Sequence, residues 1–130
     1  MKLFAACTAQ FAHGLVIASA PESTDTHDDW TPGSQAVHAG PDSLYILVRQ
    51  AASGLATVQC VQGPYLPENK VLMYTGQLIL PAASLVIADP NETVRLVIPV
   101  PNIENQVEIY GDGSREPDEV TIVLSGDESW

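Results

Sequence analysis

The sequence predicts an all-β domain, an antiparallel β-sandwich with Greek-key-like connections and about eight to nine short strands. Apolar or alternating runs of strand length recur along the chain, with turn-forming residues between them. Aromatic residues make up 6% of the chain, so small and β-branched aliphatic residues must fill the interior, and these suit sheets. A chain of 130 residues has the usual size of one domain, and we assign residues 1–130 to a single core.

The strand candidates can be placed in order along the chain. Each has the length of an ordinary strand, and no segment shows the sustained periodicity of a helix. The candidates are residues 3–11, 15–19, 44–50, 56–61, 71–80, 84–88, 93–100, 106–110 and 119–124.

Glycine, proline and asparagine separate these runs and predict tight turns. The clearest signals are Gly63-Pro64, Asp89-Pro90-Asn91, Pro101-Asn102 and Gly111-Asp112-Gly113. Residues 21–41 predict one long polar loop that is rich in acidic residues, with a single helical turn expected near residues 33–38. Long loops in compact domains often carry function, so this loop is a candidate binding element.

The charge balance restricts the class of ligand. The chain has 16 acidic residues against 5 basic ones, a formal net charge of -11. A field of this sign repels phosphate and anionic lipid, which argues against nucleic acid and membranes, and it attracts cationic protein surfaces. General solubility is the other explanation for such acidity.

The acidic residues concentrate in two zones that frame a nearly neutral middle. Zone 104–128 contains Arg115 as its single base, and zone 22–42 contains no Lys or Arg. If folding brings the zones onto one face, they form a negative patch that fits a basic cleft. The acids are Glu104, Glu108, Asp112, Glu116, Asp118, Glu119, Asp127 and Glu128 in the first zone, and Glu22, Asp25, Asp28, Asp29 and Asp42 in the second.

The N-terminal residues imitate a secretory signal, because an apolar stretch ends in the small residues 18–20. Gln10 and His13 interrupt that stretch, so we expect a strand there and a cytoplasmic protein. No run reaches the roughly eighteen apolar residues that a membrane span requires. Cys7 and Cys60 lie in apolar strand candidates and are expected to be free buried thiols. A disulfide between them is the alternative if the protein is exported.

The sequence contains no motif of a known catalytic site. It lacks a G-x-S-x-G elbow, a phosphate-binding glycine loop and an H-E-x-x-H pair. The histidines do not share the spacing of zinc ligands, and residues 111–114 lack the ligand pattern of an EF-hand. We therefore expect no enzyme activity, no metal and no cofactor.

Three features resemble the start of the competence protein J family. Gln10-Phe11 comes first, then the acidic loop that ends in Asp29-Trp30-Thr31, then the strand Ser-Leu-Tyr-Ile-Leu-Val at residues 43–48. The resemblance covers roughly the first half of the chain. Members of that family are small, acidic, largely β proteins that inhibit a DNA-entry nuclease, so the resemblance implies an inhibitor with a nuclease partner.

We expect an inhibitor or immunity-type protein that binds a basic enzyme, such as a nuclease or toxin, and blocks its cationic cleft. Its acidic loops would carry the contacts, with carboxylates in the place of substrate phosphates. For Trp30 two interpretations are open, since the ring can close one end of the sandwich or anchor an interface. The expected contact residues are Asp25, Asp28, Asp29, Trp30, Asp112, Glu116, Asp118 and Glu119.

Two other functions remain as alternatives. One is a structural subunit of the phage or virion type, which would form homo-oligomers through its strand edges and bury a large apolar interface. The other is a sandwich that binds a carbohydrate or a small ligand, which would need a concave aromatic pocket. The low aromatic content disfavours this last function.

Overall fold

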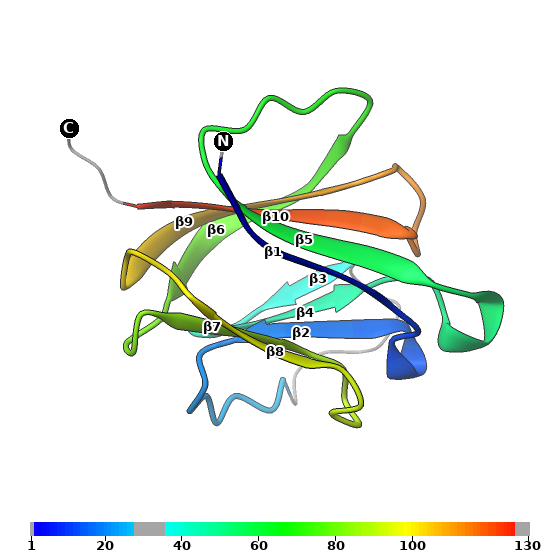
Figure 1. Cartoon of the computed structure of the whole chain (residues 1–130), viewed down its shortest axis with the longest axis horizontal. Helices are drawn as coiled ribbons and strands as arrows, with labels where there is room; N and C mark the ends of the chain where they lie inside the picture. Colours follow the sequence, from blue (N-terminus) through cyan, green and yellow to red (C-terminus); the bar gives the residue numbers. More distant parts are fainter. Residues whose placement is uncertain (1, 28–35, 127–130) are drawn as a thin grey trace.

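Two five-stranded sheets pack face to face in the computed structural model, which describes residues 2–27 and 36–126 (Figure 1). The strand order is β1-β5-β10-β9-β6 in sheet A and β3-β4-β2-β7-β8 in sheet B. This arrangement confirms the predicted all-β sandwich. The strands are β1 (Lys2–Ala9), β2 (Leu15–Ser19), β3 (Val37–Ala39), β4 (Ser43–Leu47), β5 (Ala56–Gln62), β6 (Val71–Ile79), β7 (Ser84–Ala88), β8 (Arg95–Pro99), β9 (Glu104–Gly111) and β10 (Glu119–Gly126), and the short 3-10 turns are η1 (Ala12–Gly14) and η2 (Ala51–Ser53).

Sheet B is antiparallel throughout, whereas sheet A contains one parallel pair, β5 with β10. The pair is in register from Glu119 opposite Thr57 to Leu124 opposite Gln62. Because parallel strands begin at the same edge of a sheet, the loop that enters β10 lies beside the loop that enters β5. This placement positions the acidic β9–β10 loop against the connection between β4 and β5.

Each predicted run forms a strand, but the structure adds β3, where a helical turn was expected near residues 33–38. The helical prediction was wrong for the described part of that segment. Ala36 is not helical, and Val37 pairs with Ile46 at the edge of β4. Val37 is 8% exposed and belongs to the main core, so pairing beside β4 places a β-branched side chain in the interior.

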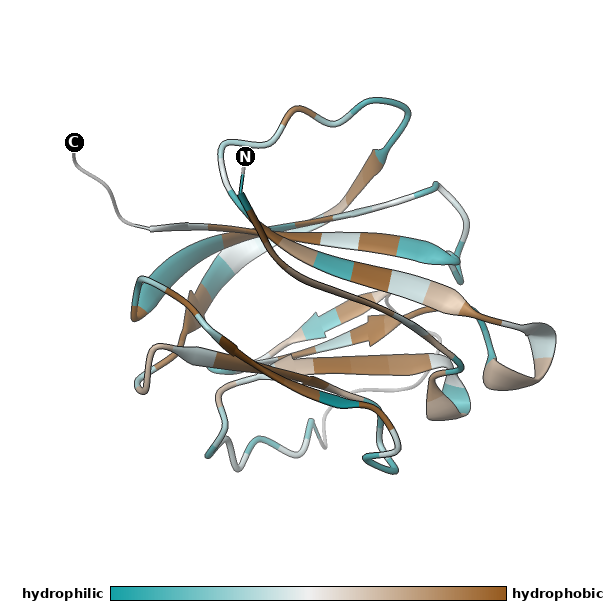
Figure 2. Cartoon of the chain, viewed as in Figure 1, coloured by the Kyte–Doolittle hydropathy of each residue, from teal (hydrophilic) through white to brown (hydrophobic). Residues whose placement is uncertain are grey.

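The main core lies between the sheets and consists largely of aliphatic side chains. Phe11, Leu44, Leu85, Ile109 and Ile122 are fully buried there. In Figure 2, β5 and β10 change between brown and teal or white along their length. This alternation is that of a strand with one face in the core and the other outside.

A second, small cluster lies outside the main core on sheet A. Val61, Tyr110 and Val123 are buried in it, and Tyr65 packs on them from the loop between β5 and β6. The ring centroids of Tyr65 and Tyr110 are 5.5 Å apart. The cluster therefore holds the loop of residues 63–70, which rises above the sheet in Figure 1.

Both cysteines are free, as the sequence predicted. Cys60 on β5 is buried, whereas Cys7 on β1 is partly exposed, so the prediction of two buried thiols was correct only for Cys60. Burial raises the pKa of the Cys60 thiol to about 12. Within residues 2–27 and 36–126, the structure contains no helix with the length and apolar character needed to cross a membrane.

Candidate partner-binding surface

The loop between β9 and β10 carries four of the predicted contact residues. Asp112, Glu116, Asp118 and Glu119 are all exposed. The turn begins at Asp112, whose Oδ1 accepts hydrogen bonds from the Ser114 amide at 2.8 Å and from the Ser114 hydroxyl at 2.5 Å. A hydrogen bond from an amide to the side chain of the aspartate two residues earlier closes an Asx turn. Such a turn fixes the local path of the chain.

Contacts with the neighbouring connection hold the rest of this loop. The Arg49 amide donates to the Pro117 carbonyl at 3.0 Å, and the Thr57 amide donates to the Asp118 carbonyl at 2.8 Å. Gln50 Nε2 donates to Glu116 Oε2 at 2.9 Å. The loop backbone is therefore bonded on both sides of Glu116, while the carboxylates face solvent.

Acidic side chains outnumber basic ones in this loop, in which Arg115 is the one base. Hydrogen bonds from Ser114 hold the pKa of Asp112 below its usual range, burial opposes this shift, and contacts with Asp118 lower it further. Lys70 Nζ forms an ion pair with Glu119, and this hydrogen bond raises the pKa of Lys70. The loop thus presents exposed carboxylates, with Arg115 among them and Lys70 at its border.

Asp25 lies at a different place in the fold. Its carboxylate covers Gly40 in the β3–β4 turn, since a Cβ at Gly40 would lie 1.6 Å from Asp25 Oδ2. The β9–β10 loop contacts Arg49, beyond the opposite end of β4. Five residues of β4 separate the two positions, which is roughly 17 Å. Asp25 therefore does not join the loop carboxylates, and Asp28, Asp29 and Trp30 lie outside the described residues.

A cluster around the buried His27 lies beside Asp25, and sequence reasoning did not identify it. His27 Nδ1 is 2.6 Å from His38 Nδ1, and His27 Nε2 is 2.9 Å from Ser43 Oγ. The His27 ring stacks on Tyr45 with centroids 3.8 Å apart. The pairing of β3 with β4 sets His38 opposite Tyr45, and the folded loop places His27 on them, so the spacing of these residues in the sequence carried no signal.

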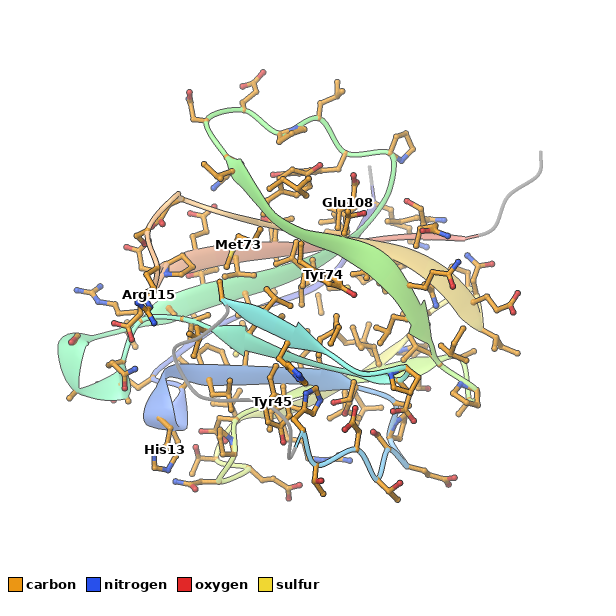
Figure 3. All side chains as sticks on the ribbon, turned by 180° about the vertical axis from the view of Figure 1, so that it is seen from behind. His13, Tyr45, Met73, Tyr74, Glu108 and Arg115 are labelled. Carbon is orange, nitrogen blue, oxygen red and sulfur yellow. The ribbon has the colours of Figure 1, made fainter. Side chains whose placement is uncertain are left out.

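Figure 3 labels Arg115 in the β9–β10 loop and Tyr45 beside the histidine cluster, at separate places on the molecule. The histidine cluster joins two positions of the predicted loop of residues 21–41, namely His27 and His38. Among the described residues, no three His, Cys, Asp or Glu side chains gather as metal ligands. Hydrogen bonds and ring stacking hold the cluster together.

Two clefts lie at the end of sheet A that is farther from the β9–β10 loop. Together they involve Gln77, Ile79 and residues 101–106, and their volumes are about 290 and 510 Å³. No aromatic residue lines either cleft. They therefore lack the stacking surface that the carbohydrate-binding alternative requires.

Comparison with known proteins finds no match in sequence but finds proteins of similar fold. No protein-family model matches the chain, and no curated protein matches it in sequence. The crystal structure of ComJ from Bacillus subtilis superimposes on this chain with a TM-score of 0.73 at 15% identity. The match covers 96% of this chain and 97% of ComJ. ComJ is described as an inhibitor of the DNA degrading activity of NucA. The chain shares the fold of ComJ.

The similarity to ComJ spans nearly the whole chain, beyond the N-terminal half in which the sequence resemblance was found. A second solved structure, described as Crocagin biosynthetic gene J, has a TM-score of 0.62 at 14% identity and covers 95% of this chain and 96% of that one. The fold-level resemblance to competence protein J is thereby confirmed. At such identities the comparison concerns the fold, and function has to be argued from the surface.

Proposed function

We propose that this protein is a non-enzymatic inhibitor of the immunity type, which binds a basic enzyme of the nuclease or toxin class and occludes its cationic active cleft. The observation that carries the proposal is the exposed, backbone-fixed carboxylate loop of residues 112–119 on a fold shared with ComJ. ComJ is described as an inhibitor of the DNA degrading activity of a nuclease, which gives this fold a precedent for such a role.

The mechanism is electrostatic and steric. A net charge of -11 accelerates encounter with a positive cleft, where the carboxylates of Asp112, Glu116 and Asp118 occupy the positions of substrate phosphates. Since backbone hydrogen bonds already order the loop, little conformational entropy is lost when it docks.

Three further features support a binding role in the cytoplasm rather than catalysis. Cys60 is buried with a pKa near 12, which disfavours the thiolate that a nucleophile requires. Asp89, a buried carboxylate, uses both oxygens to accept hydrogen bonds within its own turn and from Ala12. Unpaired cysteines also fit a reducing compartment.

The experiment is capture of the partner from host lysate at low salt, followed by an activity assay of the captured enzyme. We expect a basic enzyme in a 1:1 complex that added protein inhibits. The variant Asp112→Asn/Asp118→Asn should associate about 10-fold more slowly at low ionic strength and show a shallower salt dependence. The matched control is Glu92→Gln/Glu104→Gln, which removes two exposed carboxylates elsewhere on the sandwich.

Two results would contradict the proposal. Equal association rates for the two double variants would exclude the β9–β10 loop as the contact. Recovery of the chain alone as a salt-resistant homo-oligomer would support the alternative of a structural subunit that assembles through strand edges.

A further inference from the structure

Exposed apolar side chains concentrate in one short segment of the chain. Leu66 is 89% exposed, and Val71 and Leu72 are each 49% exposed. The other large exposed apolar residues of the described chain are scattered singly, which is normal for a protein surface. Figure 2 shows brown segments in the loop that precedes β6 and at the start of β6.

The loop that carries Leu66 is held at three points. At its start the Gly63 amide donates to the Leu124 carbonyl at 2.9 Å. Next to Leu66, Tyr65 packs on Tyr110 in the small outer cluster. At its end Lys70 forms the ion pair with Glu119. Both ends of the loop are thus tied to sheet A, which limits the entropy that Leu66 loses on binding.

This apolar segment borders the acidic loop. Val71 pairs with Gly111, the last residue of β9, and its Cγ2 lies 3.3 Å from the position of a Cβ at Gly113. Lys70 lies close enough to Asp112 for that carboxylate to raise the pKa of Lys70. Exposed apolar groups and exposed carboxylates thus share one end of sheet A.

We propose that Leu66, next to Tyr65, and Leu72, paired with Tyr110 on the same outer face of sheet A, form the apolar centre of a partner-binding surface whose acidic rim is the β9–β10 loop. The occupant is a cationic protein surface with an apolar pocket for Leu66, bordered by Lys or Arg side chains that meet Asp112 and Asp118. Charge complementarity selects this occupant over a second copy of the chain, because two copies of charge -11 repel each other. The inference rests on the proposed inhibitor function and adds the residues that retain the partner.

The acidic rim and the apolar centre of this surface should control different rates of binding. Carboxylates at the rim act over a distance and set the association rate, which salt reduces. A buried apolar anchor acts only in the docked complex and sets the dissociation rate, on which salt has little effect. Leu66→Ala should therefore raise the dissociation rate about 10-fold and leave the association rate unchanged.

The test measures both rates for the enzyme captured in the preceding experiment, at low and at high salt. Leu66→Ala is compared with Val97→Ala, which truncates an exposed aliphatic residue of β8 in sheet B. Both positions are more than half exposed, so both variants should retain the melting temperature of the wild type. We expect faster dissociation only for Leu66→Ala, by the same factor at both salt concentrations.

The outcomes separate this inference from the proposed function. If Leu66→Ala and Val97→Ala dissociate at the same rate while Asp112→Asn/Asp118→Asn still slows association, the apolar anchor is wrong and the inhibitor function stands. If the wild type forms no complex with a basic enzyme, the inhibitor function fails, and the anchor fails with it.

Discussion

Replacement of Asp89 by asparagine should destabilise the fold by about 3 kcal/mol. The Asp89 carboxylate is buried at the end of β7. Its Oδ1 accepts from the amides of Thr93 at 2.8 Å and Val94 at 3.3 Å, and its Oδ2 accepts from the Ala12 amide at 3.1 Å and from the Thr93 hydroxyl. The carboxylate therefore closes the β7–β8 turn and joins it to η1.

The magnitude follows from the bonds that an asparagine can keep. Its single oxygen can still accept the two turn amides, and the Thr93 hydroxyl can rotate to accept from the new amide group. The Ala12 amide then faces a donor, and an unsatisfied buried amide costs about 1–3 kcal/mol. Loss of the negative charge weakens the remaining bonds, because bonds to a charged acceptor contribute about 1.5–3 kcal/mol each against roughly 1 for neutral ones.

The assay is urea denaturation at pH 7, with Glu92→Gln as the control because Glu92 is an exposed carboxylate in the same turn. The control should change the free energy of unfolding by less than about 0.5 kcal/mol. Asp89→Asn should lower the melting temperature by roughly 10 °C. If the two variants unfold at the same urea concentration, the hydrogen bonds of Asp89 do not stabilise the turn, and the reasoning is refuted.

The same carboxylate predicts a dependence on pH. Burial raises the pKa of Asp89, but the hydrogen bonds from Thr93, Ala12 and Val94 outweigh burial and lower it below the ordinary value. Because the pKa of Asp89 is lower in the folded state than its unfolded-state value of about 3.9, ionisation of Asp89 stabilises the fold above that pH. This contribution is lost as the pH falls through the folded-state pKa. The difference between wild type and Asp89→Asn should thus be full at pH 7 and shrink below about pH 4.

Three further predictions test other parts of the structure. Cys60 should resist a thiol reagent at pH 8 in the native protein, whereas the partly exposed Cys7 should react, and unfolding should release the second equivalent in a colorimetric thiol assay. Gly14→Ala should cost at least about 2 kcal/mol in chemical denaturation, because its φ is +61° and a Cβ would meet a carbonyl at 2.9 Å. His38→Ala should lower the free energy of unfolding by about 1 kcal/mol, since it removes the hydrogen bond between the two imidazoles, and an unchanged denaturation midpoint would show that this bond is dispensable.

Local patterns in the sequence were sufficient to predict most of the fold. The run at residues 15–19 became β2 with the same bounds, and the run at residues 84–88 became β7. The Asp-Pro-Asn signal at residue 89 became the β7–β8 turn. These predictions succeed because side-chain alternation and turn chemistry act over a few neighbouring residues.

The candidate site was only partly predictable. The sequence identified the carboxylates of residues 112–119 as exposed and acidic, and the structure describes them so. It did not reveal that Val71 lies beside Gly113 or that Tyr65 supports the neighbouring loop, because those contacts depend on the pairing of β6 with β9 and on packing across sheet A. His27 and His38 were missed for the same reason.

By itself, the sequence determined the fold class, the sign of the surface field and the positions of the strands, since composition, charge and short-range periodicity are properties of the chain as written. Tertiary structure alone decided that Asp25 lies away from the acidic loop, that β5 runs parallel to β10 and that an apolar segment adjoins the carboxylates. These relations join residues far apart in the chain. They are fixed by which sheet edges pair and which faces pack, and no local pattern encodes that choice.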